Sequence, residues 1–357
     1  MRVALIGRPG SGKTTLFNAL GGNRPKVPHP PGEEGSVVSV EVPDPRLEWL
    51  RVLHSPRKCT PARIEFEDLP GLPAGEPRGK AELLAEVRRA DGLLLILRAF
   101  RDPTYPYEKV EPDPLGEARG LREELLFSDY AILHGRIERL EASLKKPTRT
   151  REQEERELAS LTRLVHGVEA EGKDLREIPM SKEEALLVRS FAFASRKPIL
   201  VVLNAAEGTL EGDPAVAPVL AAFPGAILLH ALLEEEIAGL PEEERAAFLR
   251  DFGLPEPARA RLLPTVLRTI GLVAFLTTGE DEVRAWTIRA GETALDAAGK
   301  VHTDLARAFI KAEVTAFEDL REAGSWREAK ARGKVRLEGK DYVVKDGDIV
   351  HIRAGGA

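Results

Sequence analysis

Short apolar runs separated by Gly- and Pro-rich loops dominate residues 1 to about 115. Runs of about four to eight apolar residues predict buried strands, and a longer stretch with helical periodicity predicts a helix. The expected strands are residues 3–6, 63–67, 92–97 and 199–203, and the expected helix is 13–20. Strands that alternate with helices at this spacing favour a mostly parallel sheet in an α/β fold.

A heptad pattern replaces this alternation between residues 126 and 168. Apolar residues recur in steps of three and four, and Pro147 interrupts the series. The apolar seam consists of Leu126, Tyr130, Leu133, Ile137, Leu140 and Leu144, followed by Leu158, Leu161, Val165 and Val168. Two such seams joined by a Pro-containing turn predict an antiparallel helical hairpin. The turn, residues 145–151, has four basic residues and no acidic one, so it is either a solvated turn or a contact site for a polyanion.

The last part of the chain, from about residue 273, is short and mixed in pattern. Residues 283–288 predict a strand, residues 293–313 contain helix, and residues 335–352 predict two or three short strands. The turns expected among these last strands are Glu338-Gly339 and Asp346-Gly347. Together these elements are enough for a small α+β module.

Composition narrows the class of protein. The chain has 357 residues, 43% of them hydrophobic, which is enough for two or three packed cores and excludes global disorder. No apolar run approaches the ~20 residues that span a bilayer, and Met1 leads straight into the first strand without a secretion signal. Cys59 is the only cysteine, so neither an internal disulfide nor a zinc cluster is expected. These features predict a cytoplasmic protein that is not embedded in a membrane.

The first chemical signal lies between the first strand and the first helix. Residues 7–14 read GRPGSGKT and match the pattern G-x-x-x-x-G-K-[ST] in its required strand–loop–helix context. Backbone N–H groups of such a loop surround phosphates as an anion nest, and the helix N-terminus adds partial positive charge. We expect Lys13 to reach the β- and γ-phosphates and the Thr14 hydroxyl to ligate Mg²⁺. The residues expected around the nucleotide here are Gly7, Gly10, Ser11, Gly12, Lys13, Thr14 and Thr15.

A second motif follows the second predicted strand. Residues 68–71 read DLPG, which is a D-x-x-G pattern at the end of a strand. We expect Asp68 to hold the Mg²⁺ through water and the Gly71 amide to sense the γ-phosphate, so Lys13, Asp68 and Gly71 are the predicted catalytic residues. Ras-like enzymes place a water-orienting Gln after this glycine, whereas Leu72 stands here and cannot hydrogen-bond a water.

A third motif follows the late strand at residues 199–203. GTPases have N-K-x-D at this place, where the Asp accepts two hydrogens from guanine, but residues 204–207 here read NAAE. The longer Glu207 crowds the guanine edge, and adenine offers no N1–H for an acid to accept, so the change favours ATP. Asn204 can still bond N7 or an exocyclic group of either purine.

Taken together, these residues resemble the Obg-like ATPase (YchF) family, a branch of the P-loop GTPases related to translation factors. Residues 42–47 (VPDPRL) and the altered base motif both resemble that family. Residues 236–240 (EIAGL) resemble the stretch after its last nucleotide loop, which implies that His230, Ala231 and Leu232 lie beside the base. Three C-terminal stretches resemble the family's TGS domain, a small ubiquitin-like fold: 282–288 (EVRAWTI), 298–304 (AGKVHTD) and 338–348 (EGKDYVVKDGD).

The resemblance implies an architecture of three parts. Residues 1–119 and 198–272 would form a P-loop G domain, residues 120–197 a helical coiled-coil insertion, and residues 273–357 the TGS domain. It also implies a Mg²⁺-dependent hydrolase of ATP, with GTP as a possible second substrate. Association with the ribosome or RNA is implied as well, and we expect a monomer.

The first switch departs from the family pattern. The family has a Thr there that ligates Mg²⁺, but no Thr occurs between Thr15 and Thr60, and residues 25–34 are rich in Pro and acid. Ser36 is the available substitute. Gly10 stands where the family has an Asn linked to potassium dependence, so potassium activation lacks its usual residue.

A further departure concerns the loop after the strand at residues 92–97. Many members have a His there as a candidate water-orienting group, but no His lies between His54 and His134. Nucleotide binding is therefore better supported than fast hydrolysis.

Three functions remain open at this stage. The leading one is a slow ribosome-associated hydrolase of ATP or GTP, and the alternative is a nucleotide-latched ribosome- or RNA-binding module with negligible turnover. A small-molecule kinase shares the P-loop but has neither the base motif nor the C-terminal module.

The net charge of −6 excludes a generally basic surface. Residues 327–340 nevertheless form a basic stripe with six Lys or Arg and two Glu, which could contact rRNA or be solvated.

Overall fold

The computed structural model describes residues 1–22, 36–73, 80–102, 112–147, 149–254 and 256–355. The chain forms two compact units, one of Met1–Val38 with Phe66–Phe248 and one of Ser39–Glu65 with Leu249–Ala357. Residues 39–65, which the sequence assigns to the G domain, thus belong to the unit of the C-terminal module. The predicted three-part boundaries remain a prediction. No helix within the described ranges is both long and apolar enough to cross a bilayer.

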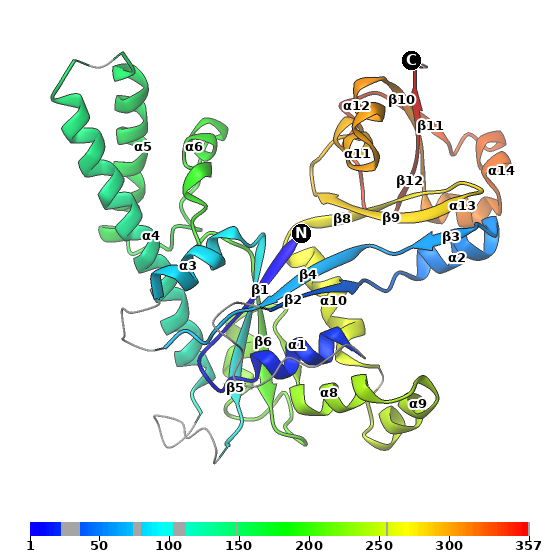
Figure 1. The fold of residues 1–357 in the computed structure, drawn as a ribbon, viewed down its shortest axis with the longest axis horizontal. Helices are drawn as coiled ribbons and strands as arrows, with labels where there is room; N and C mark the ends of the chain where they lie inside the picture. The colour runs from blue at the N-terminus through cyan, green and yellow to red at the C-terminus, as the bar shows by residue number, and fades with distance from the viewer. Residues whose placement is uncertain (23–35, 74–79, 103–111, 148, 255, 356–357) are drawn as a thin grey trace. The chain divides into compact units, whose positions relative to one another are not determined.

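The first sheet has six strands in the order β2-β4-β1-β5-β6-β7 (Figure 1). Neighbours from β1 to β7 pair in parallel, which confirms the predicted mostly parallel sheet. The strands are β1 Arg2–Ile6, β2 Ser36–Glu41, β4 Arg63–Asp68, β5 Gly92–Ala99, β6 Ile199–Ala205 and β7 Ile227–Leu229. The helices connected with this sheet are α1 Lys13–Gly21, α3 Lys80–Arg89, α7 Ala217–Ala222, α8 Ala231–Gly239 and α9 Glu242–Asp251.

The hydrophobic pattern explains the centre of this sheet. Residues 93–97 of β5 and 200–205 of β6 are buried without alternation, as expected for parallel strands covered on both faces. Their side chains pack with the apolar sides of α3 and α7 in one hydrophobic core. All four strands expected in this part of the chain are present, whereas β2 and β7 were not expected.

The heptad seam forms a helical arm, as predicted. The arm consists of α4 Pro114–Leu144, α5 Arg151–Glu169, α6 Lys182–Leu187 and a 3₁₀ turn at Arg189–Phe191. The Asp113 carboxylate caps α4 by accepting the Gly116 N–H at 2.9 Å. The first turns of α4 pack into the sheet core through Ala118, Leu121 and Leu125, and from Leu133 onward the helix packs with α5 in a separate core of the arm. The continuous helix α4 therefore joins the first sheet to the arm.

The second sheet has the order β11-β10-β12-β8-β9-β3. Its strands are β3 Lys58–Thr60, β8 Leu272–Thr277, β9 Glu282–Arg289, β10 Phe309–Ala316, β11 Arg336–Glu338 and β12 Asp348–Ala354. The helices of this unit are α2 Pro45–His54, α10 Ala258–Thr269, α11 Ala294–Val301, α12 Thr303–Arg307, α13 Phe317–Ala323 and α14 Trp326–Ala331. β8 and β12 pair in parallel and the other C-terminal pairs are antiparallel, which confirms a mixed α+β module. Residues 309–313, at the end of the stretch expected to contain helix, belong to β10.

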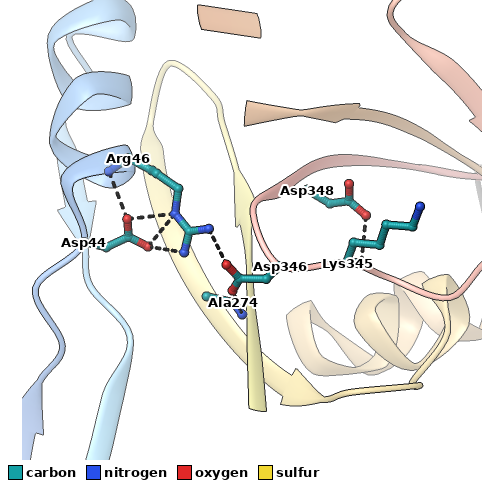
Figure 2. A network of polar contacts seen from close by, with 6 residues as sticks. All are labelled: Asp44, Arg46, Ala274, Lys345, Asp346 and Asp348. Carbon is teal, nitrogen blue, oxygen red and sulfur yellow. Dashed lines mark hydrogen bonds and ion pairs between the residues drawn. The ribbon is translucent and has the colours of Figure 1, made fainter. Parts of the chain in front are cut away.

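A polar network fastens α2 within this second unit (Figure 2). The Asp44 carboxylate caps α2 and binds Arg46, whose Nη1 donates to Asp346 Oδ2 at 2.7 Å. Asp346 Oδ1 in turn accepts the Ala274 N–H of β8 at 2.8 Å. Beyond α2, β3 pairs in parallel with β9 and extends the sheet by one strand. The VPDPRL stretch noted in the sequence is therefore a structural anchor of the C-terminal unit.

Candidate functional site

The predicted motifs lie at the carboxyl ends of strands in the first sheet. The P-loop follows β1, Asp68 is the last residue of β4, Asn204 lies at the end of β6, and His230 follows β7. Carboxyl ends of parallel strands meet at one edge of a sheet, which is where α/β proteins bind their ligands. The fold therefore brings together motifs that are more than 200 residues apart in sequence.

The P-loop has the backbone conformation that its glycines permit. Gly10 and Gly12 have φ angles of +75° and +88°, in the left-handed region that disfavours residues with a Cβ. A Cβ on Gly12 would also lie 2.1 Å from Asn204 Nδ2. The Leu16 N–H donates to the Gly12 carbonyl at 3.0 Å as α1 begins directly after the loop. This is the strand–loop–helix geometry of an anion nest.

Burial dominates the electrostatics of Lys13. The side chain is buried, and Nζ donates to the Arg8 carbonyl oxygen at 3.3 Å. Burial lowers the pKa of the Lys13 ammonium below its usual value, against the opposing attraction of Asp68 and Glu117. An ammonium that is poorly solvated in this way gains strongly from an anionic ligand such as a nucleotide phosphate.

Thr14 and Asp68 form the core of the candidate metal site. The Thr14 hydroxyl donates to Asp68 Oδ2 at 2.6 Å, and both side chains are buried. A hydroxyl beside a buried carboxylate is an oxygen donor set of the kind that Mg²⁺ prefers, with waters and substrate phosphates completing its shell. The residues present therefore fit the predicted ion. Within the described ranges, no group of three or more His, Cys, Asp or Glu residues gathers into another metal site.

The D-x-x-G segment lies against the P-loop. A Cβ added to Gly71 would lie 2.6 Å from the Pro9 nitrogen, so the close approach requires glycine. The Leu72 N–H donates to the Gly7 carbonyl at 3.0 Å, and the Leu72 side chain is 1% exposed within the sheet core. The side chain that stands in place of the water-orienting Gln is therefore turned into the core.

Arg8 links the P-loop to the helical arm, a role that sequence reasoning missed. Its Nη1 donates to the Leu72 carbonyl at 3.0 Å, and its Nη2 donates to Glu124 Oε1 on α4 at 2.8 Å. Lys80, the first residue of α3, places Nζ 3.0 Å from Glu124 Oε2. Arg8 occupies a variable position of the P-loop pattern, and Glu124 is 116 residues away, so no local signal announces the pair.

Asn204 connects two loops of the site. Its Nδ2 donates to the Ser11 carbonyl at 3.0 Å, and its Oδ1 accepts the Ala231 N–H at 2.9 Å. One proton of the amide nitrogen is thereby committed to the P-loop, and an amide nitrogen carries two. The arrangement ties the P-loop to the start of α8, and contact of Asn204 with a purine remains a prediction.

The other residues predicted beside the base lie around this amide. His230 precedes α8, with Nδ1 3.2 Å from the Ala205 carbonyl oxygen, and Ala231 is fully buried. Leu232 is 67% exposed and offers an apolar surface. Glu207 is exposed beyond the end of β6. Thr15 is half-buried in the first turn of α1.

A buried pair holds the two helices of the site together. Asn18 Nδ2 on α1 donates to Glu235 Oε1 on α8 at 3.1 Å. The sequence marks neither residue as a partner of the other, because their contact arises only from the packing of α1 on α8. The first switch, residues 25–34, lies outside the described residues, and Ser36 is the first residue of β2.

A phosphate-binding loop, a Thr–Asp pair and a base-side loop at one sheet edge define a P-loop nucleoside triphosphatase. A family model described as "50S ribosome-binding GTPase" matches residues 2–115. A second model, for the C-terminal domain of YchF GTPases and described as a protein of unknown function, matches residues 272–355. The chain is 34% identical to the "Ribosome-binding ATPase YchF" of Bacillus subtilis, covering 99% of each protein. The chain therefore belongs to the YchF family, and the resemblance drawn from the motifs is confirmed.

Two further relatives agree with this assignment. The chain is 32% identical to "Obg-like ATPase 1" of Oryza sativa, over 99% of this chain and 92% of that protein. The solved structure of the Schizosaccharomyces pombe YchF GTPase superposes with a TM-score of 0.83 at 25% identity, covering 99% and 97% of the two chains. This likeness confirms the predicted P-loop fold, while the name TGS for the C-terminal module remains a prediction.

Proposed function

We propose that the protein binds and slowly hydrolyses ATP, accepts GTP less well, and associates with the ribosome. The observation that carries the hydrolase is the buried Thr14–Asp68 pair beneath a P-loop whose lysine is also buried. Family membership adds that characterised relatives are named ribosome-binding ATPases. Membership in this family also removes the reason to consider a small-molecule kinase.

Catalysis in this proposal consists of positioning and charge stabilisation. Lys13 and the P-loop amides hold the β- and γ-phosphates, and the Gly71 amide contacts the γ-phosphate. Thr14 and Asp68 would hold Mg²⁺, which neutralises charge on the phosphates when bound. Replacing Asp68 by Asn should weaken Mg²⁺ affinity by about 10–100-fold, as removal of metal-orienting groups does elsewhere.

Base choice in this proposal depends on Glu207 and the surfaces near it. Leu232 would contact the face of the purine, and Ala231 and His230 would line its edge. Among the residues that the structure describes, no polar group binds the exposed Glu207 and holds it away from a base, and its extra methylene disfavours guanine. ATP is therefore the proposed substrate and GTP the weaker one.

Calorimetric titration and a phosphate-release assay test this function. ATP is expected to bind more tightly than GTP, and Lys13→Ala should abolish both binding and release. Micromolar GTP binding without detectable ATP binding would contradict the account of Glu207. Release that persists unchanged in Lys13→Ala would identify a contaminating enzyme.

A second candidate function is a nucleotide-operated latch without significant turnover. The burial of Leu72 favours it, because that side chain cannot orient an attacking water. Phosphate release measured with and without ribosomes distinguishes the two functions. Stimulation by ribosomes supports the hydrolase, and bound ATP that stays intact in both conditions supports the latch.

The proposal also covers the location of the protein and its oligomeric state. A protein that binds ribosomes acts in the cytoplasm, and we propose that this one acts as a monomer. Sedimentation velocity of the purified chain checks the assembly state directly.

A further inference from the structure

Three basic residues at the end of the helical arm have no role in the nucleotide site. Lys145, Lys146 and Arg149 lie in the short turn between α4 and α5, and we refer to them as the arm tip. Figure 1 shows α4 and α5 side by side, with this turn joining them at one end. All three side chains are exposed.

Between positions 121 and 197, six of the twelve basic residues outside the arm tip form ion pairs with acids of the same arm. Arg136 binds Glu157 with two hydrogen bonds of 2.7 and 2.8 Å, and Arg163 lies 2.7 Å from Glu184. Four more pairs have the same character: Arg122–Asp174, Arg151–Glu155, Arg156–Glu152 and Lys173–Glu171. The arm has 15 basic and 15 acidic residues between positions 121 and 197, so it carries no net charge as a whole.

The arm tip differs from these six paired positions of the arm. Residues 145–151 contain no acid, and among the described residues none of the three tip cations forms an ion pair. Exposed ion pairs contribute about 0–1 kcal/mol each to folding, so unpaired cations here add nothing to the stability of the hairpin. Their repulsion in one short turn acts slightly against it.

The position of Arg149 likewise does not stabilise the fold. It immediately precedes Thr150, the N-cap of α5, where the helix dipole is positive. A cation near that end is disfavoured by about 0.3–1 kcal/mol. Formation of α5 therefore gains nothing from Arg149, which points to a partner outside the fold.

The competing basic surface, the stripe at residues 327–340, is partly neutralised within its own module. Lys330 lies 2.9 Å from Glu313, and Lys334 lies 2.9 Å from Asp319. Arg336 binds Glu338 at 3.0 Å. Half of the stripe's cations are thus already paired, whereas the arm tip is free of such pairs.

We propose that the arm tip is a contact site for the phosphate backbone of RNA, through which the protein engages ribosomal RNA. This inference rests on the ribosome association proposed above. Clustered exposed cations release condensed counterions when they meet a phosphate backbone, which drives association without base recognition. α4 has 31 residues and is about 45 Å long, so the tip can reach RNA from a distance.

The test compares three triple variants with equal changes in net charge. The tip variant is Lys145→Glu/Lys146→Glu/Arg149→Glu, and the arm control is Arg139→Glu/Lys182→Glu/Arg189→Glu. The stripe variant is Arg327→Glu/Arg332→Glu/Lys340→Glu, which changes three cations of the competing surface that pair with no carboxylate in the described part of the chain. Each full-length protein is measured by co-sedimentation with purified 70S ribosomes and by fluorescence anisotropy with an RNA duplex of about 20 base pairs. Helicity and ATP binding, measured in parallel, confirm that the variants fold.

The tip variant is expected to lose about tenfold or more in affinity for both probes. Its slope of log affinity against log salt should fall by about two to three, since each lost phosphate contact removes about 0.7–0.9. The arm control should bind like the wild type. Undiminished binding of the tip variant overturns the proposal, as does a loss confined to the stripe variant.

Two further outcomes separate the tip from the proposed function. Ribosome binding that depends on the tip without any affinity for the RNA duplex would identify a ribosomal protein as the partner and overturn the RNA assignment. Wild-type protein that fails to sediment with ribosomes would contradict the association itself, and the tip proposal with it.

Discussion

Arg8 of the P-loop donates a hydrogen bond of 2.8 Å to Glu124 on α4, so one side chain joins the phosphate-binding loop to the helical arm. The Arg8 and Glu124 side chains are only 20% and 19% exposed, which limits screening by solvent. The same guanidinium binds the Leu72 carbonyl just after the D-x-x-G motif. The P-loop, the segment after the D-x-x-G motif and the arm thus share one charged group.

A double-mutant cycle should detect this connection. Arg8→Ala and Glu124→Ala are expected to couple by about 1 kcal/mol or more, within the 0.5–3 kcal/mol range of contacting residues, because the pair is shielded. Urea unfolding of the two single variants and the double variant gives the coupling. The exposed pair Arg89–Glu86 is the matched control and should couple by less than about 0.5 kcal/mol. Equal coupling in both pairs would contradict a special role for Arg8.

Asn204 and Glu207 should respond differently to substitution. Asn204→Ala removes two hydrogen bonds that organise the loops, and buried bonds of this kind are worth about 1–3 kcal/mol. We expect ATP and GTP affinity to fall together, by about tenfold. Glu207→Asp should instead raise GTP affinity relative to ATP, because the shorter acid leaves room for guanine. Calorimetric titration with ATP and with GTP measures these affinities. An effect of Asn204→Ala on only one of the two nucleotides would show that Asn204 contacts the purine directly.

Lys13→Met should stabilise the nucleotide-free protein at pH 7. Burial lowers the pKa of Lys13, so the unfolded chain binds this proton more tightly than the folded one. The charged lysine therefore opposes folding below its folded pKa, and this penalty fades as the pH rises through that pKa toward about 10.4. Thermal unfolding at several pH values should show a higher Tm for the variant at pH 7 and a smaller difference at pH 9.5. A lower Tm for Lys13→Met at pH 7 contradicts this prediction.

His351 of β12 should make the C-terminal unit sensitive to acid. Burial lowers the pKa of His351, helped by His54 and opposed by Glu313, and its ring stacks on Trp326 at 4.0 Å. Because the unfolded histidine titrates near 6.5, the stability from the neutral folded form is present above that pH and lost as the pH falls below it.

Replacement by glutamine checks the prediction for His351. His351→Gln should flatten the decline of the urea midpoint between pH 7 and pH 5, followed by tryptophan fluorescence. His302→Gln, at an exposed histidine of the same unit, is the matched substitution with which the decline is compared. A decline equally steep in His351→Gln would assign the acid sensitivity to other groups.

Local patterns were sufficient to predict several elements of the fold and of the candidate site. The P-loop, the strand that ends at Asp68 and the heptad hairpin each depend on short-range periodicity or on a motif with a fixed context. These elements could be predicted because each is defined by residues that lie close together in the sequence. The mixed C-terminal module was predicted for the same reason, from turns and alternating strands.

Long-range partners were not predictable in this way. Nothing near Arg8 specifies Glu124, and nothing near Asn18 specifies Glu235, because these contacts arise only when α1, α4 and α8 pack. The roles of Asp44 and Arg46 were hidden because their partner Asp346 lies 300 residues further along the chain than Arg46.

The strand β3 has a consequence for how the protein is divided. It lies in sequence between the P-loop and Asp68, yet it forms the outer strand of the C-terminal sheet beside β9. The C-terminal module is therefore interleaved with the nucleotide-binding sequence and was not simply appended to its end. A fragment cut at residue 271 would keep α2 and β3 without the sheet that they complete, leaving an unpaired strand edge open to aggregation. Completion of the C-terminal sheet thus requires residues 58–60 from the early part of the chain.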